Sequence, residues 1–413
     1  MTRTSAARLW SVTMFTGVAL LLGVAAAAQV AAVGSLSLQA AIDRALAANP
    51  TIAAARLTGA VNQAGLALAG EWPNPEVTAE FEKETPKQAF GLALPVELGG
   101  KRSKRIAVSE ATIRAGEAAL AATIAQVRND VRRAYYAVLV ADARLALLRE
   151  LRDLSQRVRD TAQARFDTGD APRLEVLQAG LTLAAADNEA ATADGLSAAA
   201  RTRLNALLGQ PLDTSLQLST PLDAGGPIAI DVTLNLAQKG STELAVLDQQ
   251  IEEQRAKVTL AEALRVPDLV PTATLTHDAQ PEFTYGWRAG VAVTLPMFTT
   301  HKAGVRVEQA TLDQLTAQRE AAAIRMTGEV TAATAAAEAQ RQTYLRYRDS
   351  ILPQAQEVEQ LAQDSYQLGQ TGIAALLQAL QASRDVRLRS VDAVSQFHVA
   401  LADLERAIGA PLP

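Results

Sequence analysis

The chain has 413 residues, a formal net charge of −5 at neutral pH and no cysteine, and aromatic residues make up only 4% of it. This composition excludes disulfide bonds and thiolate metal ligands, and it lacks the basic balance of a nucleic-acid-binding protein. We therefore expect no nucleic acid as a partner. The scarcity of aromatic residues favours closely packed, alanine-rich helices over one large globular core.

Residues 1–28 have the pattern of a secretory signal peptide. Arg3 and Arg8 form a positive region, an apolar run follows, and Ala26 and Ala28 fit a cleavage site. An uncleaved anchor helix is the alternative. No later stretch approaches the ~20 apolar residues of a transmembrane helix, so a membrane-spanning part would have to be a closed β-barrel.

The remaining sequence consists of two similar halves. Residues 164–179 align with residues 364–379, and residues 201–212 align with residues 401–412, both at a spacing of 200 positions. Several matches in the same order indicate a duplication. We predict a first structural repeat over 29–220, a linker rich in proline and glycine over 221–232, and a second repeat over 233–413.

Each repeat has the same predicted elements in the same order. A helix comes first, two strands follow, and then a very long helix, a glycine turn and a return helix complete the repeat. Apolar residues recur at threes and fours in the long helices, which at 1.5 Å per residue would extend roughly 90–100 Å. The predicted helices cover 38–70, 104–166 and 174–208 in the first repeat, and 233–264, 303–366 and 374–408 in the second.

Two strands are predicted at about 75–97 and two at about 268–296, and their residues alternate between apolar and polar or small. A strand of nine or ten residues has the length of a tilted membrane strand, with apolar side chains toward lipid and polar ones toward a lumen. A sheet of a soluble domain explains the alternation equally well. Four strands cannot close a channel, so they would have to be pooled between subunits. The predicted lipid-facing residues are Phe81, Phe90, Leu92, Leu94, Trp287, Val291 and Val293, and the predicted lumen residues are Thr78, Glu80, Glu82, Arg288 and Thr294.

Both strand pairs end at a proline, Pro95 or Pro296, and a long helix with basic residues follows. Near the rim of a barrel, these cations could meet lipid phosphates or neighbouring carboxylates, and a solvated run of charges is the third possibility. The cations of the first repeat are Lys101, Arg102, Lys104 and Arg105.

These motifs together resemble the TolC family of outer-membrane efflux proteins. The resemblance covers nearly the whole mature chain, through LSLQAAIDRALAANPTIAAAR, LPVELGGKR, the paired glycine turns that precede LQA, and the repeat ends LLGQPL and AIGAPL. It implies a mostly α-helical protein with a β-barrel part. Three protomers would form a twelve-stranded barrel in the outer membrane of a Gram-negative bacterium, continuous with an α-helical barrel in the periplasm. The ELGGKR motif is most similar to the heavy-metal branch, the cobalt–zinc–cadmium resistance components.

The resemblance also implies partners and an entrance. A periplasmic adaptor and an inner-membrane pump, of the RND type, would join the trimer, and the helical hairpin turns would form its entrance. In the family's best-known channel, paired aspartates form an acidic ring there, but the second repeat has Ala375 and Gln378 at these positions. An acidic ring would therefore depend on Glu175 or Asp170. The predicted entrance and adaptor residues are Gly169, Asp170, Glu175, Gln178, Gly369 and Gln378.

No catalytic pattern is present in the sequence. It contains no GxGxxG, P-loop or HExxH motif, and His277, His301 and His398 are not spaced as metal ligands. We therefore expect no catalytic, cofactor-binding or metal-binding residue. The predicted function is the exit duct of a tripartite efflux system for heavy-metal cations or small toxic compounds. A type I protein-secretion duct on the same fold and a periplasmic coiled-coil scaffold are the alternatives.

Overall fold

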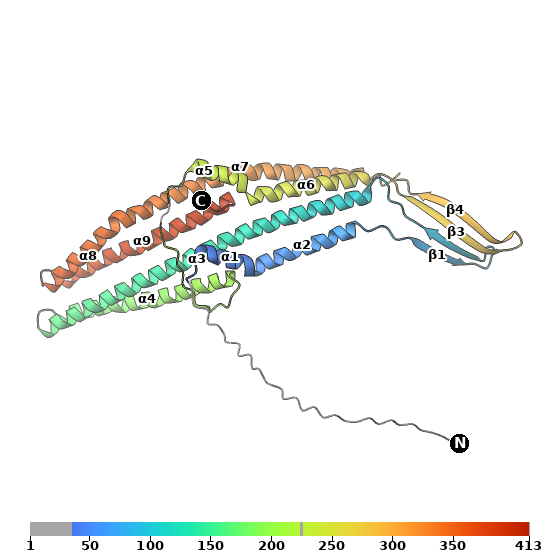
Figure 1. Ribbon diagram of the computed structural model, residues 1–413. Coiled ribbons are helices and arrows are strands. Elements are labelled where there is room, and N and C mark those ends of the chain that lie inside the picture. The colour runs from blue at the N-terminus through green and yellow to red at the C-terminus, as the bar shows by residue number, and fades with distance from the viewer. Residues whose placement is uncertain (1–34, 224–225, 413) are drawn as a thin grey trace, which may run out of the picture. The chain divides into compact units, whose positions relative to one another are not determined.

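Two copies of one arrangement of helices and strands make up the structure (Figure 1). The computed structural model describes residues 35–223 and 226–412, so the predicted signal peptide lies outside the described residues. The first repeat contains α1 (Leu38–Ala48), α2 (Pro50–Ala69), β1 (Glu76–Phe81), β2 (Gln88–Ala93), α3 (Lys101–Asp167) and α4 (Arg173–Leu207). The second contains α5 (Ile230–Gly240), α6 (Thr242–Ala263), β3 (Leu269–Ala279), β4 (Phe283–Val293), α7 (Lys302–Arg346), the π-helical turn η1 (Tyr347–Ile351), α8 (Leu352–Gln367) and α9 (Ile373–Ile408).

The first predicted helix of each repeat is in fact two helices, so the prediction of one continuous helix is wrong. Asn49 ends α1, and its side chain accepts a hydrogen bond from the Thr51 N–H at the start of α2, where Pro50 is the first residue. In the second repeat, the Ser241 hydroxyl caps α6 through the Leu244 N–H. Such capping residues and proline favour a new helix start over continuation. Helix α5 also begins at Ile230, inside the predicted linker.

The long helices run between the strands at one end and the hairpin turns at the other (Figure 1). Helix α3 has 67 residues without interruption. Its counterpart is interrupted, because one π-helical turn separates α7 from α8 and Pro353 stands near the start of α8. Among the described residues, no helix combines the length and the apolar character that crossing a membrane requires.

The four strands form one antiparallel sheet in the order β1-β2-β3-β4. Each repeat contributes one hairpin, and β2 of the first repeat pairs with β3 of the second. Over residues 35–223 and 226–412, β1 and β4 are the two edge strands and pair with no further strand.

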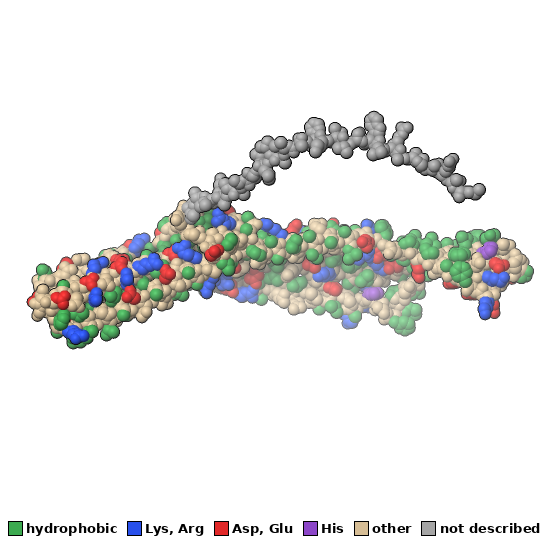
Figure 2. Space-filling view, turned by 90° about the horizontal axis from the view of Figure 1, so that it is seen from below, with side chains coloured by type: hydrophobic (Ala, Val, Ile, Leu, Met, Phe, Trp, Pro, Cys, Tyr) green, Lys and Arg blue, Asp and Glu red, His purple; other side chains and the backbone are tan. Residues whose placement is uncertain are grey.

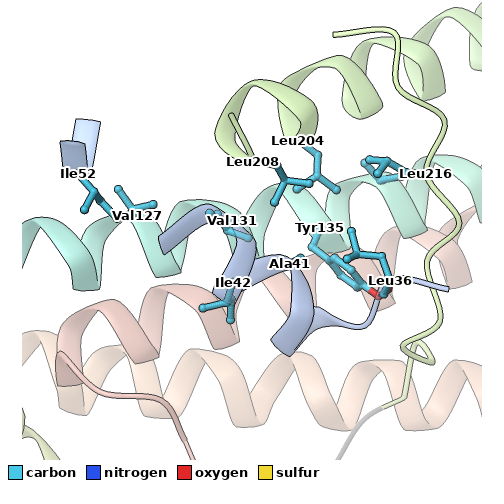
Figure 3. Packing of buried hydrophobic residues seen from close by; sticks show 12 residues of the cluster. Leu36, Ala41, Ile42, Ile52, Val127, Val131, Tyr135, Leu204, Leu208 and Leu216 are labelled. Atoms are coloured by element: carbon cyan, nitrogen blue, oxygen red, sulfur yellow. The ribbon is translucent and has the colours of Figure 1, made fainter. Parts of the chain in front are cut away.

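A hydrophobic cluster around Tyr135 joins α1, α3 and α4 at the middle of the helical part (Figure 3). The Tyr135 hydroxyl donates to the Leu36 carbonyl at 2.7 Å and accepts the Thr220 N–H at 3.2 Å, so it connects the chain before α1 with the last residue of the first repeat. A buried tyrosine is stable only where its hydroxyl finds such partners. Other members of the cluster are Ala41, Ile42, Val127, Val131, Leu204, Leu208 and Leu216.

The end of each return helix packs identically in the two repeats. Gly209 and Gly409 both have positive φ, and each faces the carbonyl that ends the first helix of its repeat, at Ala48 or Gly240. A Cβ at either glycine would overlap that carbonyl, so both the dihedral and the space require glycine. The duplication in the sequence is therefore also a duplication of packing.

Candidate functional site

The strand register places two kinds of side chain on the two faces of the sheet. On the apolar face, Val77 lies opposite Leu92, and Leu92 lies opposite Ala273. Successive side chains of a strand point to opposite faces, so the same face carries every second residue of each strand. Gln88 and His277 are the polar members of this face, near the loops. Its other members are apolar or aromatic: Ala79, Phe81, Phe90, Leu269, Pro271, Leu275, Tyr285, Trp287, Ala289, Val291 and Val293.

The opposite face is polar and narrow. One row runs across all four strands through Thr78, Gly91, Thr274 and Arg288. A Cβ at Gly91 would overlap the Thr78 hydroxyl, and a Cβ at Gly286 would lie 2.7 Å from the Thr276 hydroxyl. At these two glycine positions a side chain would therefore displace the facing threonine hydroxyl.

Three charged residues, Glu76, Glu80 and Arg288, lie on this polar face. Among the described residues, neither Glu80 nor Arg288 forms an ion pair, although they share the face. Of the other predicted lumen residues, Glu82 directly follows β1 and Thr294 directly follows β4. Predicted lipid-facing Leu94 follows β2, and its N–H donates to the Pro271 carbonyl at 3.0 Å.

Three of the four basic residues at the start of α3 contact acceptors of the same chain, and two of these acceptors are neighbouring carboxylates, one of the possibilities left open by the sequence. Lys101 Nζ lies 2.7 Å from Asp268 Oδ1, and Arg105 forms an ion pair with Glu97. Arg102 donates to the Gly70 carbonyl at 2.7 Å. Lys104 is half-buried and has no ion pair among the described residues.

The two hairpin turns at the other end have the same geometry. Gly169 and Gly369 have φ of 85° and 73°, as the sequence predicts for helices that must reverse at a glycine. The following N–H groups, of Asp170 and Gln370, each donate back into the preceding helix at 2.8 Å. No atom lies within 4 Å of a Cβ built on either glycine, so the dihedral angle alone demands glycine.

Polar contacts join the two hairpins close to these turns. The buried Tyr366 of α8 donates its hydroxyl to Glu175 Oε2 of α4 at 2.9 Å. The Arg165 guanidinium lies 4.7 Å from the centroid of the Tyr366 ring and donates to the Tyr366 carbonyl at 3.2 Å. Burial and the hydrogen bond to Glu175 raise the pKa of Tyr366 to about 12, so its hydroxyl remains a donor at physiological pH.

Within the described residues, the other predicted entrance residues form no hydrogen bond between the two hairpins, although the Asp170 carbonyl accepts one from Arg165 of its own hairpin at 3.4 Å. Asp170 is exposed and accepts the Thr168 hydroxyl at 2.8 Å inside its own turn. Gln178 is half-buried on α4, and Gln378 is exposed on α9. Sequence reasoning missed Tyr366 and Arg165. The signal was present, since the repeat places an aromatic residue three positions before each turn glycine, Phe166 and Tyr366, in a chain poor in aromatic residues.

An apolar groove of about 460 Å³ separates the two hairpins along part of their length. Charged pairs cross between the hairpins beside it, since Arg384 of α9 lies 2.6 Å from Glu189 of α4 and Arg387 lies 2.6 Å from Glu150 of α3. The apolar lining consists of Leu148, Leu151, Leu154, Leu181, Leu377 and Leu380, with several small residues. Charged side chains of both signs are spread along the helices on the face seen in Figure 2.

A buried polar cluster lies farther from the turns, where α3 packs against α9. Arg132 of α3 pairs with Glu405 of α9, and Asn129 donates to the Ala402 carbonyl. His398 is 5% exposed and stacks on Tyr136 with ring centroids 3.8 Å apart, and neither ring nitrogen has a hydrogen-bond partner among the residues that the structure describes. Burial, and then the nearby Arg132, lower the pKa of His398 to about 4, so it is neutral at physiological pH.

No group of three or more potential metal ligands occurs in residues 35–223 and 226–412. His277 lies in β3 beside Tyr285, His301 precedes α7, and His398 is enclosed by aromatic rings, so the three histidines are far apart along the fold. The arrangement offers two surfaces, a two-faced sheet and a helical hairpin end.

Comparisons with known proteins find a matching family and several proteins of similar sequence or structure. The model of the outer membrane efflux protein family matches residues 41–210 and 233–410, one match for each repeat. The cobalt-zinc-cadmium resistance protein CzcC of Cupriavidus metallidurans is 25% identical over 381 residues, which cover 91% of this chain and 90% of that protein. A solved structure of CusC, described as forming a transmembrane channel, has a TM-score of 0.74 at 17% identity and covers 90% of this chain and 92% of its own. The CmeC outer membrane channel of Campylobacter jejuni has a TM-score of 0.75 at 16% identity, with 90% and 85% covered. The solved structures therefore share this fold.

Proposed function

The chain belongs to the outer membrane efflux protein family, and from this premise we propose that it is the outer-membrane exit duct of a tripartite efflux system that exports heavy-metal cations. An inner-membrane pump of the RND type supplies the energy, and a periplasmic adaptor connects pump and duct. The observation that carries the proposal is the two-faced sheet with two free edges. The name of the relative CzcC, a cobalt-zinc-cadmium resistance protein, supports the cargo.

The sheet supports assembly from three copies. One chain supplies four strands, which are too few to enclose a channel, and its edges β1 and β4 are unpaired. Unpaired edges with an apolar face are stable only when another strand and an apolar surrounding cover them. In a homotrimer each β4 pairs with β1 of the next copy, the apolar face meets lipid, and the polar face lines a wetted lumen.

The lumen and the entrance each carry a carboxylate, and three copies related by three-fold symmetry would arrange each of them as a ring of three. Glu80 is unpaired on the polar face, and Glu175 lies just after the first hairpin turn. Rings of carboxylates favour cations in a narrow pore without binding them permanently. This suits an exit duct, whose cargo must leave again.

The hairpin end suits the role of an entrance that meets the adaptor. The apolar groove between the hairpins, of about 460 Å³, offers a surface for apolar side chains of a partner helix. The contact between Tyr366 and Glu175 holds the two hairpins of a chain together beside it. An adaptor that separates these residues would widen the entrance.

The test is metal accumulation in cells that lack the gene but retain the pump and the adaptor. Returning the wild-type gene should lower intracellular cobalt, zinc and cadmium and restore growth in their presence. The matched control is the Leu92→Arg variant, which cannot place its apolar face in lipid. If the wild-type gene changes neither metal content nor growth while a polypeptide substrate disappears from the medium of the deletion strain, the protein is a secretion duct instead.

A further inference from the structure

The two places where a strand passes into a long helix differ in what covers them. The first corner, residues 94–101, packs on the segment just before β3, residues 266–268. Lys101 Nζ lies 2.7 Å from Asp268 Oδ1, and the Leu98 N–H donates to the same oxygen at 3.0 Å. A Cβ at Gly99 would lie 3.0 Å from the Val266 side chain. This cover leaves the Lys101 side chain only 7% exposed.

The second corner, residues 295–302, has no such cover from the described part of the chain. Phe298 is 99% exposed and Met297 is 72% exposed. Lys302, the residue that matches Lys101 at the start of the helix, is exposed and forms neither a hydrogen bond nor an ion pair within the described residues. Exposed apolar residues beside an unpaired cation mark a surface that is complete only with a partner.

The repeat identifies the missing partner. Gly100 and His301 occupy the same place before α3 and α7, with positive φ of 67° and 56°. Likewise Trp72, Pro73 and Asn74 follow α2 as Val266, Pro267 and Asp268 follow α6. The segment before β1, residues 72–74, is therefore the counterpart of the segment that covers the first corner. Its Trp72 is 67% exposed, although Arg102 lies over the indole at 4.6 Å.

We propose that the second corner of each copy packs on residues 72–74 of the next copy, in the way the first corner packs on residues 266–268 of its own chain. In the same register Thr300 takes the place of Gly99 beside Trp72, and the exposed Phe298 covers the remaining surface of the indole. Lys302 Nζ donates to the Asn74 side-chain oxygen. The helices next to these corners pack in the corresponding way. Helix α3 packs on α6 within a chain, and α7 packs on α2 of the next copy. This contact rests on the proposed trimer, and it assigns residues to the seam, meaning the interface between neighbouring copies of that trimer.

Cysteine cross-linking tests the contact, because the chain has no cysteine of its own. The Trp72→Cys/Phe298→Cys variant of the full chain is oxidised in outer membranes with copper phenanthroline and then separated without reductant. We expect covalent dimers and trimers. The matched control is the Val266→Cys/Phe298→Cys variant, which should stay monomeric on the gel because residue 266 lies against Gly99 of its own corner and not against the next copy. The two single variants should also stay monomeric.

Sizing of the same samples in mild detergent distinguishes a failure of this interface contact from a failure of the proposed trimeric exit duct. Trimers without cross-links in the Trp72→Cys/Phe298→Cys variant, or equal cross-linking in the control, would overturn this seam and leave the exit duct intact. Monomers in the wild-type sample would overturn both.

A second test uses charge. Asn74→Asp recreates across the seam the pair that Lys101 and Asp268 form within the chain, so the temperature at which trimers dissociate in dodecyl sulfate should rise by several degrees. The rise should shrink in high salt, which screens exposed pairs. It should vanish in Asn74→Asp/Lys302→Gln and be absent in Asn188→Asp, which adds the same charge on the exposed surface of α4. A rise that persists without Lys302 would contradict the contact.

Discussion

The sheet and the hairpin end are stabilised by different means. In the sheet, backbone pairing sets the register, the two faces differ in polarity, and ion pairs among the described residues are few, such as that between Lys87 and Asp278 near the loops. At the hairpin end, side chains make the connection, through Tyr366, Glu175 and Arg165. The sheet therefore depends on its surroundings and on other copies, whereas the hairpin end is held together within one chain.

The largest expected effect is a charge on the apolar face of the sheet. Arginine at the middle of a membrane barrel costs about 2–4 kcal/mol, because its charge must leave water. We expect Leu92→Arg to reduce the amount of trimer in outer membranes strongly, measured by fractionation and by sizing in mild detergent.

Ala89→Arg is the matched control for this substitution. Ala89 lies on the same strand but on the polar face, opposite Glu80 and Thr276. A new arginine there faces a carboxylate and a wetted lumen, so assembly should be close to wild type. Equal loss of trimer in both variants would mean that the two faces do not have different surroundings.

Acid should weaken the helical part and spare the sheet. The pKa of His398 is lowered from 6.5 to about 4 by burial and by Arg132, so the unfolded chain takes up a proton before the folded chain does. Stability is then full above about pH 6.5 and falls as the pH drops toward 4, by up to about 3 kcal/mol per copy. Hydrogen exchange at pH 7 and pH 4.5 should show faster opening around α9 but unchanged protection of β2 and β3.

His398→Phe is the control for the effect of acid. It keeps a ring against Tyr136 and removes the titrating group. Glu405, whose pKa burial raises despite Arg132, is present in both proteins, so the difference between them isolates His398. If the variant loses as much stability as the wild type between pH 6.5 and pH 4, His398 does not cause the acid sensitivity.

The sequence predicts the sheet better than it predicts the hairpin end. Alternation along a strand has a period of two, so one register assigns a face to Leu92 and Thr78 together with their neighbours. Helix ends were harder to place, since a capped break at Asn49 and Pro50 leaves the apolar pattern of the surrounding helices almost unchanged. The contact between Tyr366 and Glu175 joins residues 191 positions apart on different hairpins, so no local pattern reports it.

Substitution of the turn glycines is the next test of the hairpin end. Gly169 and Gly369 have positive φ with free space around them, so Gly169→Val and Gly369→Val strain the backbone without a steric clash. A strained backbone of this kind costs of order 1–3 kcal/mol, confined here to the turns. We expect wild-type amounts of trimer but loss of metal export, measured as intracellular cadmium. Export at the wild-type level in both variants would show that the turns are not where the duct meets its partners.

The smallest effect, and the sharpest test of how the hairpins are joined, comes from Tyr366→Phe. Phenylalanine is the residue at the matching position of the other hairpin, Phe166, so the ring should still pack beneath Arg165. The substitution removes only the hydroxyl that donates to Glu175, worth about 1 kcal/mol because the half-buried carboxylate can turn to water instead. If this bond holds the hairpins together, Tyr366→Phe and Glu175→Gln should raise the single-channel conductance of purified trimers alike, and the double variant should add little, since both remove one interaction.

If Glu175 acts instead in a ring of three carboxylates, Glu175→Gln alone should lower the preference for cations under a salt gradient. Tyr366→Phe keeps the carboxylate and should leave that preference unchanged. Additive changes in conductance from the two substitutions would contradict the idea that the Tyr366–Glu175 hydrogen bond holds the hairpins together, and an unchanged reversal potential in Glu175→Gln would contradict the ring of carboxylates.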